Sequence, residues 1–297
     1  MQTLYTLDAQ EQAVKPGEPL RILQKHFDHS RQLLIYLIYT MTEVARYAET
    51  DSRVRMSKHL PTEQDRNVNI KLAGNEYLWK MIEDPSLQKA FATDKPHLSE
   101  DKEMIKKLYQ ELVGTEEYKK YIALEGREKK SERDMMEFIF TDLLLPSEAF
   151  EAHVEELFTN WDDDVEMMSQ LMTSYIHKPQ TLNFQEILSK EKQDFANTLL
   201  RTVIEKKEVL MDLIKPKLKN WDPDRIATLD MIFMQMGVTE FLYFETIPPK
   251  VTINEYIDLA KDYSTLQSGQ FVNGILDNIH KDLVRDEKMH KINFKAS

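Results

Sequence analysis

Residues 247–279 read IPPKVTINEYIDLAKDYSTLQSGQFVNGILDNI, and this stretch decides the fold class. The two prolines near its start predict a turn at residues 247–250. Thr252 and Glu255 have the Thr-x-x-Glu spacing of a capping box, which predicts a helix running through Ala260 and Lys261. Ser268 is expected to cap a last helix. The apolar positions of that helix are Phe271, Ile275, Leu276 and Ile279.

The residues upstream continue the helical pattern. Asp222 can cap a helix whose first position is Pro223, and this helix is expected to extend to about Tyr243. Residues 184–218 form another long helical stretch, in which a break near Ser189 stays open and which Pro216 ends or kinks. Residues 21–48 carry apolar side chains at three-and-four spacing. Shorter helices are expected near 76–93, 100–113, 115–123, 131–144, 147–158 and 163–176, and residues 50–75 are expected to be a loop. The sequence therefore predicts an all-α protein.

Composition excludes several function classes. The 297 residues contain no cysteine, so disulfides, thiolate catalysis and cysteine-based metal sites are ruled out. The longest apolar run, residues 33–41, is far shorter than the ~20 residues that a bilayer requires. The N-terminus has no basic region before an apolar stretch, as a signal peptide would. We therefore expect a cytoplasmic protein without a membrane segment.

The net charge of −12 is unevenly distributed. Residues 178–297 contain 17 basic and 18 acidic residues, whereas residues 1–177 contain 22 basic and 33 acidic residues. Phosphate binding usually requires lysine and arginine, so the overall charge argues against nucleic-acid binding. The nearly neutral C-terminal part nevertheless leaves room for a local RNA-binding patch.

The C-terminal third resembles the NusB family of transcription antitermination factors. The matching stretches are residues 221–226, Asp230, 240–241, 247–255, 258–261 and 268–276, with 195–203 upstream and residues 2–5 as part of a first helix. An ordered set of motifs across several helices is far more specific than one short pattern. The resemblance implies a NusB-like helical bundle at 178–297, the start of its first helix at 1–15, and a large helical insertion at 16–177.

The resemblance also implies a function and a set of contacts. Family members bind a single-stranded boxA-type RNA together with a small-subunit ribosomal protein acting as NusE, within the transcription elongation complex, and promote ribosomal RNA transcription. Monomers and homodimers both occur, so the oligomeric state stays open. The implied RNA-binding residues are Gln2, Tyr5, Gln267, Ser268, Phe271 and Asn273. The implied partner-binding residues are Asp230, Lys250 and Asn254.

Physical chemistry gives each implied contact an alternative. Backbone N–H groups beside Ser268 would favour phosphate at a helix N-terminus. Phe271 is a stacking platform for an unpaired base if it is exposed and a core residue if it is buried. Asn273 can bond a base edge or a neighbouring loop, and Lys250 can meet a phosphate or an acidic partner or be merely solvated. Gly274 lies mid-helix, where glycine costs ~1 kcal/mol, so we expect a neighbouring helix to approach it closely.

Three features depart from the family pattern, and the first two favour a rival function. The arginine-rich run that usually precedes the first helix is missing, which suggests a late start of this chain and predicts weak, salt-sensitive RNA binding. Gln235 and Gln270 stand where the family often has arginine and lysine. The third departure is the insertion itself. The rival is a protein-only adapter that keeps the ribosomal-protein interface and has lost RNA binding.

No catalytic constellation is present in the sequence. His26 and His29 share a helix face at i,i+3 spacing, but no carboxylate motif completes a metal site, so ordinary surface or core histidines are the better interpretation. Gly-rich phosphate loops and nucleophile elbows are also absent. We therefore expect a binding protein without catalytic activity, metal or cofactor.

Overall fold

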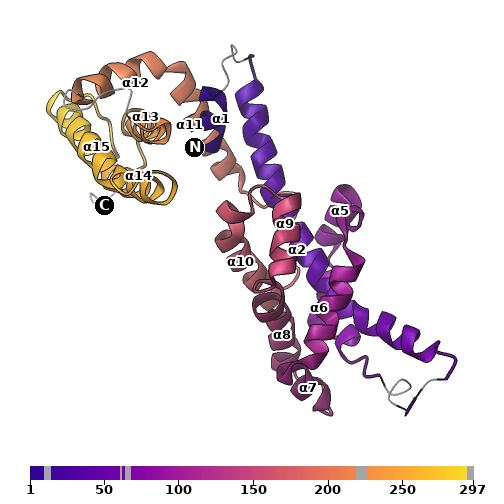
Figure 1. The fold of residues 1–297 in the computed structure, drawn as a ribbon. Coiled ribbons are helices and arrows are strands. Elements are labelled where there is room, and N and C mark those ends of the chain that lie inside the picture. Colours follow the sequence, from indigo (N-terminus) through magenta and orange to yellow (C-terminus); the bar gives the residue numbers. More distant parts are fainter. Residues whose placement is uncertain (10–14, 61, 64–67, 219–225, 293–297) are drawn as a thin grey trace. The chain divides into compact units, whose positions relative to one another are not determined.

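The computed structural model describes residues 1–9, 15–60, 62–63, 68–218 and 226–292. These residues form helices and no strand, which confirms the all-α prediction (Figure 1). The chain divides into two compact units. Unit 1 comprises residues 1–25 and 189–297, and unit 2 comprises residues 26–188. None of the described helices combines the length and the apolar character that crossing a membrane would require.

Unit 2 is built around the long helix α2, Glu18–Met56, from His26 onward. Residues 33–38 of α2 are buried without interruption, so its apolar face is covered on nearly all sides. Arg31 forms two short hydrogen bonds with the carboxylate of Asp94, at 2.6 and 2.8 Å. The other helices of unit 2 are α4 (Glu76–Ile82), α5 (Pro85–Asp94), α6 (Lys102–Gly114), α7 (Glu116–Ala123), α8 (Lys129–Phe138), α9 (Glu148–Leu157) and α10 (Trp161–His177).

Short polar side chains begin most of these helices. The side chain of the residue before the helix accepts a backbone N–H bond in each of five cases. These capping residues are Asn75, Asp84, Asp101, Thr115 and Ser147. The predicted helices overlap those of the structure, with two differences. The single helix expected at 76–93 is divided into α4 and α5, because Asp84 and Pro85 start a new helix, and α2 continues to Met56, so the expected loop begins at residue 57 and not at residue 50. After α8 the chain forms a π-helical segment, Ile139–Leu144.

Unit 1 contains α1 (Gln2–Asp8), α11 (Lys190–Glu205), α12 (Lys207–Ile214), α13 (Thr228–Tyr243), α14 (Pro249–Tyr263) and α15 (Ser268–Arg285). Helix α13 lies in the middle and contacts α1, α11, α12, α14 and α15 (Figure 1). Nearly all of α13 from Asp230 to Phe241 is buried. A helix that is enclosed in this way has no solvent face, and its small and polar side chains must therefore pack or bond internally.

Several local predictions for unit 1 are resolved by the structure. Ser189 caps α11 by accepting the N–H of Lys192, and residues 184–188 before it are not helical, so the predicted helical stretch begins at Lys190 and its expected start at residue 184 was wrong. A second break at Lys206 separates α11 from α12. The predicted cap Asp222 and helix start Pro223 lie outside the described residues, but Ile226 and Ala227 are not helical and α13 begins only at Thr228, so the early part of that predicted helix was wrong. The prediction of a turn through Lys250 was wrong, because Pro249 is already the first residue of α14.

Candidate nucleic-acid interface

The start of α15 is fixed by a hydrogen-bond network around Ser268. The predicted capping role was wrong: Gln267 is the N-cap without a side-chain bond, and Ser268 is the first residue of the helix and buried. The Ser268 hydroxyl donates to Asp230 Oδ2 at 2.8 Å. It also accepts the backbone N–H of Thr265 at 3.1 Å. This serine therefore joins the α14–α15 turn to the first turn of α13.

Asp230 carries a carboxylate into this junction. The residue is 5% exposed, and its second oxygen, Oδ1, is buried without a hydrogen-bond partner among the described residues. A negative charge beside the N-terminal turn of a helix offsets the partial positive charge of that end. The N-terminus of α15 is therefore less attractive to phosphate than an unoccupied helix end would be.

Close packing of α13 against α14 and α15 depends on Gly237. A Cβ atom at this position would lie 2.9 and 3.0 Å from the two Cδ atoms of Leu276 and 3.3 Å from Cδ2 of Tyr256. The sequence prediction assigned such an approach to Gly274, and this was wrong because nothing lies within 4 Å of the equivalent point there. Gly237 thus allows the close approach between α13 and α15, the helix that carries the candidate interface.

A buried carboxylate joins α13 to α14. Glu240 accepts hydrogen bonds from Thr252 Oγ1 at 2.8 Å and from the Tyr256 hydroxyl at 2.7 Å. The capping-box prediction for Thr252 was therefore wrong, because tertiary bonding to Glu240 replaces local capping. Burial raises the pKa of the Glu240 carboxyl, although both hydroxyl groups oppose this shift. Sequence patterns revealed neither the close packing at Gly237 nor the role of Glu240. The i,i+4 spacing of Thr252 and Tyr256 was a usable signal, because it places two hydroxyl groups on one face of a helix.

The C-terminal segment covers the end of α13. The ammonium group of Lys291 donates to the carbonyl oxygen of Glu240 at 2.8 Å and to that of Phe244 at 2.6 Å. These carbonyls belong to the last turn of α13, where a cation also interacts favourably with the helix dipole. Burial lowers the pKa of Lys291, with Glu240 and Glu245 acting in the opposite direction.

The predicted RNA-binding residues lie on two helices. Gln267, Ser268, Phe271 and Asn273 come together at the start of α15, and Gln267 and Asn273 are exposed. Phe271 is half-buried against the unit 1 core, so it is neither a fully exposed platform nor a fully buried core residue. The other two predicted residues, Gln2 (half-buried) and Tyr5 (48% exposed), lie on α1, which contacts α13.

The predicted partner-binding residues differ in exposure. Lys250 and Asn254 are exposed one turn apart on α14, and Val251 beside them is also exposed. Asp230 is buried and bonded to Ser268, so in this conformation it supports the α15 junction and has no surface to offer a partner.

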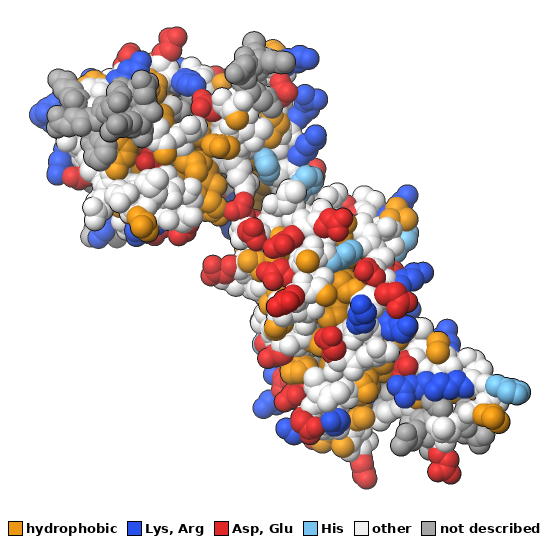
Figure 2. Space-filling model, viewed as in Figure 1, with side chains coloured by type: hydrophobic (Ala, Val, Ile, Leu, Met, Phe, Trp, Pro, Cys, Tyr) orange, Lys and Arg blue, Asp and Glu red, His pale blue; other side chains and the backbone are white. Residues whose placement is uncertain are grey.

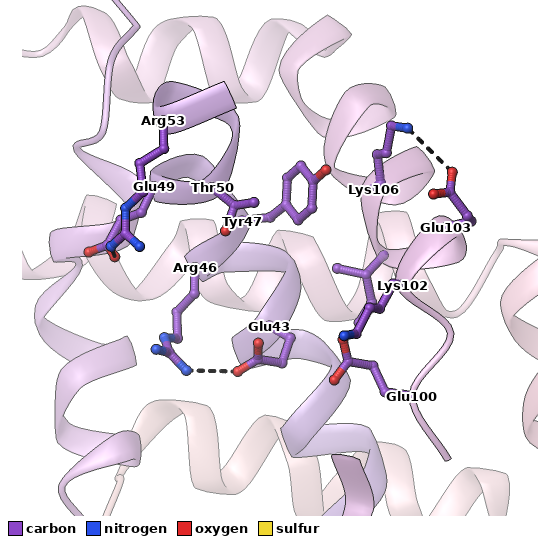
Figure 3. Close-up of a pocket in the computed structure, with 11 residues that line it drawn as sticks. Glu43, Arg46, Tyr47, Glu49, Thr50, Arg53, Glu100, Lys102, Glu103 and Lys106 are labelled. Atoms are coloured by element: carbon purple, nitrogen blue, oxygen red, sulfur yellow. Dashed lines mark hydrogen bonds and ion pairs between the residues drawn. The ribbon is translucent and has the colours of Figure 1, made fainter. Parts of the chain in front are cut away.

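Unit 2 contains a separate cleft of about 440 Å³ between α2 and the start of α6 (Figure 3). Its charged groups largely pair with one another: Arg46 with Glu43 at 2.8 Å, and Lys106 with Glu103 at 3.3 Å. Tyr47 lies among them (Figure 3). This balanced lining selects for no single sign of charge. Within the described ranges, no three histidine or acidic side chains are grouped as a metal site would require.

These features define the class: an all-helical protein whose C-terminal unit presents a polar helix start above a tightly packed core. Comparison with known proteins then shows what the C-terminal part of the chain resembles. The model of the NusB family matches residues 149–281. This match covers α11–α14, most of α15 and also α9 and α10 of unit 2. The match agrees with the resemblance that the sequence motifs showed in the C-terminal third.

Three relatives named transcription antitermination protein NusB match a shorter region. That of Methylacidiphilum infernorum is 42% identical over 95 residues, which are 32% of this chain and 66% of the relative. That of Salinibacter ruber is 41% identical over 99 residues, 33% of this chain and 62% of the relative. That of Chloroherpeton thalassium is 37% identical over 99 residues, which are 33% of this chain and 47% of the relative. Each match spans less than two thirds of the relative's length. No solved structure matches the chain.

Proposed function

We propose that this protein is a transcription antitermination factor. It binds a boxA-type single-stranded RNA together with a small-subunit ribosomal protein acting as NusE, and so promotes ribosomal RNA transcription in the elongation complex. One observation carries the proposal: the region that resembles antitermination proteins includes α15, and the start of this helix exposes Gln267 and Asn273 beside the half-buried ring of Phe271. Aromatic rings and carboxamides are the groups that recognise unpaired bases.

Charge supports placing the RNA on unit 1. Its sequence contains 19 basic and 20 acidic residues, whereas unit 2 contains 20 basic and 31 acidic residues. No lysine or arginine occurs between residues 134 and 177, and acidic side chains gather over α9 and α10 (Figure 2). Unit 2 therefore repels a phosphate backbone, while unit 1 is close to neutral.

The partner contact belongs on α14 in this proposal. Lys250 and Asn254 are exposed there, and Val251, at 45% exposure, supplies apolar area beside them. Asp230 acts indirectly, by holding Ser268 and the α15 start in place. We also propose that residues 16–177 are an insertion into a NusB-like region formed by 1–15 and 178–297. The compact units, which separate at 25 and 188, support this division in outline, whereas the family-model match already begins at residue 149.

A protein-only adapter is the second candidate function. It is favoured by the buried Asp230 carboxylate, which weakens the attraction of the α15 start for phosphate. It is also favoured by Gln235, which is buried against Met211 and adds no positive charge to the surface.

A binding titration separates the two candidates. A fluorescent boxA-type RNA and a scrambled RNA of the same composition are titrated with the full chain, alone and with the ribosomal protein, at several salt concentrations. We expect preferential binding of the boxA-type RNA that tightens when the ribosomal protein is present. If the chain binds the ribosomal protein but binds both RNAs weakly and with equal affinity, the protein-only adapter is the function that remains.

A further inference from the structure

The cleft of unit 2 between α2 and the start of α6 is large enough for a small molecule. Its volume is about 440 Å³, and all of its lining residues belong to unit 2 (Figure 3). Eight charged side chains line it, four of each sign. A ligand with charge of only one sign would therefore meet as much repulsion as attraction.

Most of these charges are paired with one another. The pairs are Glu43 with Arg46 at 2.8 Å, Glu49 with Arg53 at 3.3 Å, and Glu103 with Lys106 at 3.3 Å. The other two charged residues of the cleft are Glu100 and Lys102. Within the described residues the Lys102 ammonium has no partner, and the Glu100 carboxylate has only the neutral Tyr39 hydroxyl, which donates to it at 2.5 Å. One cation and one anion of the cleft thus stay without an ionic partner.

These two groups lie together at the start of α6. Lys102 is the first residue of the helix and Glu100 lies two residues before it, and both charged ends point toward α2 (Figure 3). Burial raises the pKa of the Glu43 carboxyl on α2, and the charge of Glu100 adds to this, whereas Arg46 opposes it. Two carboxylates that influence each other in this way favour a cationic group between them.

Tyr47 gives the cleft an apolar wall with a polar end. Its half-buried ring packs against Tyr109, with 5.2 Å between the ring centroids. Its hydroxyl has no hydrogen-bond partner in the described part of the chain. The buried side chain of Ile105 adds apolar surface to the lining. A ligand with a charged head and a partly apolar body would therefore find a complement for each part.

We propose that this cleft binds a free amino acid, a small molecule with one ammonium and one carboxylate group. The ammonium group lies between Glu100 and Glu43, the carboxylate binds Lys102, and the rest of the ligand lies against Tyr47. The ligand then supplies a partner for both unpaired charges, which a ligand of one sign cannot do. This site goes beyond the proposed function and does not depend on it.

Isothermal titration calorimetry with the full chain tests the ligand class. Each common amino acid is titrated in turn, together with its amide, which lacks the carboxylate, and its N-acetyl derivative, which lacks the ammonium group. We expect at least one amino acid to bind, and both of its derivatives to bind about tenfold more weakly or worse, because each has lost one charge-assisted contact. Equal binding of either derivative, or no binding by any amino acid, would overturn the proposal.

Substitutions locate the site. Lys102→Met and Glu100→Gln should each weaken binding about tenfold or more, and glutamine keeps an acceptor for the Tyr39 hydroxyl. Lys107→Met is the matched control, because Lys107 is exposed on the same helix and does not line the cleft. In the wild type, the bound amino acid should also add hydrogen-exchange protection at residues 43–53 and 100–106. Unchanged affinity in Lys102→Met, or added protection only elsewhere, would contradict the assignment.

Discussion

Replacing Gly237 with alanine perturbs the closest approach between α13 and α15. The new Cβ atom would lie 2.9 and 3.0 Å from the Cδ atoms of the fully buried Leu276, where 3.4 Å or more is ordinary. Overpacking of this kind costs roughly 1–3 kcal/mol, because a core side chain must leave its preferred rotamer. Alanine regains about 1 kcal/mol of helix propensity. We therefore expect a net loss of about 1 kcal/mol in the stability of unit 1.

A second substitution isolates the cause. Leu276→Ala alone should cost about 2–5 kcal/mol through the cavity it leaves. In that background the two contacts with Leu276 are gone and only the 3.3 Å approach to Tyr256 Cδ2 remains, so most of the propensity gain of about 1 kcal/mol should be recovered. The effects of the two substitutions should therefore be non-additive, with the double variant more stable than Leu276→Ala.

Amide hydrogen exchange in α13 and α15 is the appropriate assay, because it reports the opening free energy of unit 1 separately from that of unit 2. Gly274→Ala on the open face of α15 provides the reference for the propensity gain alone. If Gly237→Ala stabilised α13 and α15 as much as Gly274→Ala does, the packing argument would be refuted.

Three further predictions concern charged groups that are buried or half-buried. Lys291→Ala should destabilise unit 1 by about 1–2 kcal/mol in urea unfolding, because two carbonyl groups at the end of α13 lose their charged donor. The control Lys281→Ala, on the exposed face of α15, should change the stability of unit 1 little. Because the folded-state pKa of Glu240 is raised, the stability that this group contributes falls as the pH rises above about 4.5. In unfolding experiments at several pH values, Glu240→Gln should therefore gain stability relative to the wild type as the pH rises. A stability difference that stays constant with pH would contradict this. Arg31→Ala should destabilise unit 2 by about 3 kcal/mol in urea unfolding, because Asp94 loses its partner; no loss would contradict this.

The sequence predicted helices well where the deciding interactions are local. Capping side chains and three-and-four periodicity depend on neighbours within one or two turns, so the helix that begins after Ser147 was predicted from the sequence alone, whereas the start after Ser189 was only left open as a break. The family motifs added a resemblance of the C-terminal third to the NusB family, and the family model matches residues 149–281. The contacts of individual interface residues remain predictions.

The failures share one physical reason. Thr252 has the spacing of a capping box, but its hydroxyl is bound to Glu240 on another helix, and no local pattern encodes that partner. Ser268 was expected to cap and is instead the donor to a buried carboxylate on α13. Gly237 and Gly274 both lie within helices, and only the packing of α13 against α15 tells which one is crowded.

Hydrogen exchange with and without ligands tests the central claim most directly. The full chain is labelled alone, with the ribosomal protein, and with the ribosomal protein plus boxA-type or scrambled RNA. We predict that boxA-type RNA adds protection at residues 266–278 beyond that given by the ribosomal protein, and that scrambled RNA does not. Added protection confined to unit 2, or none at the α15 start, would contradict the account.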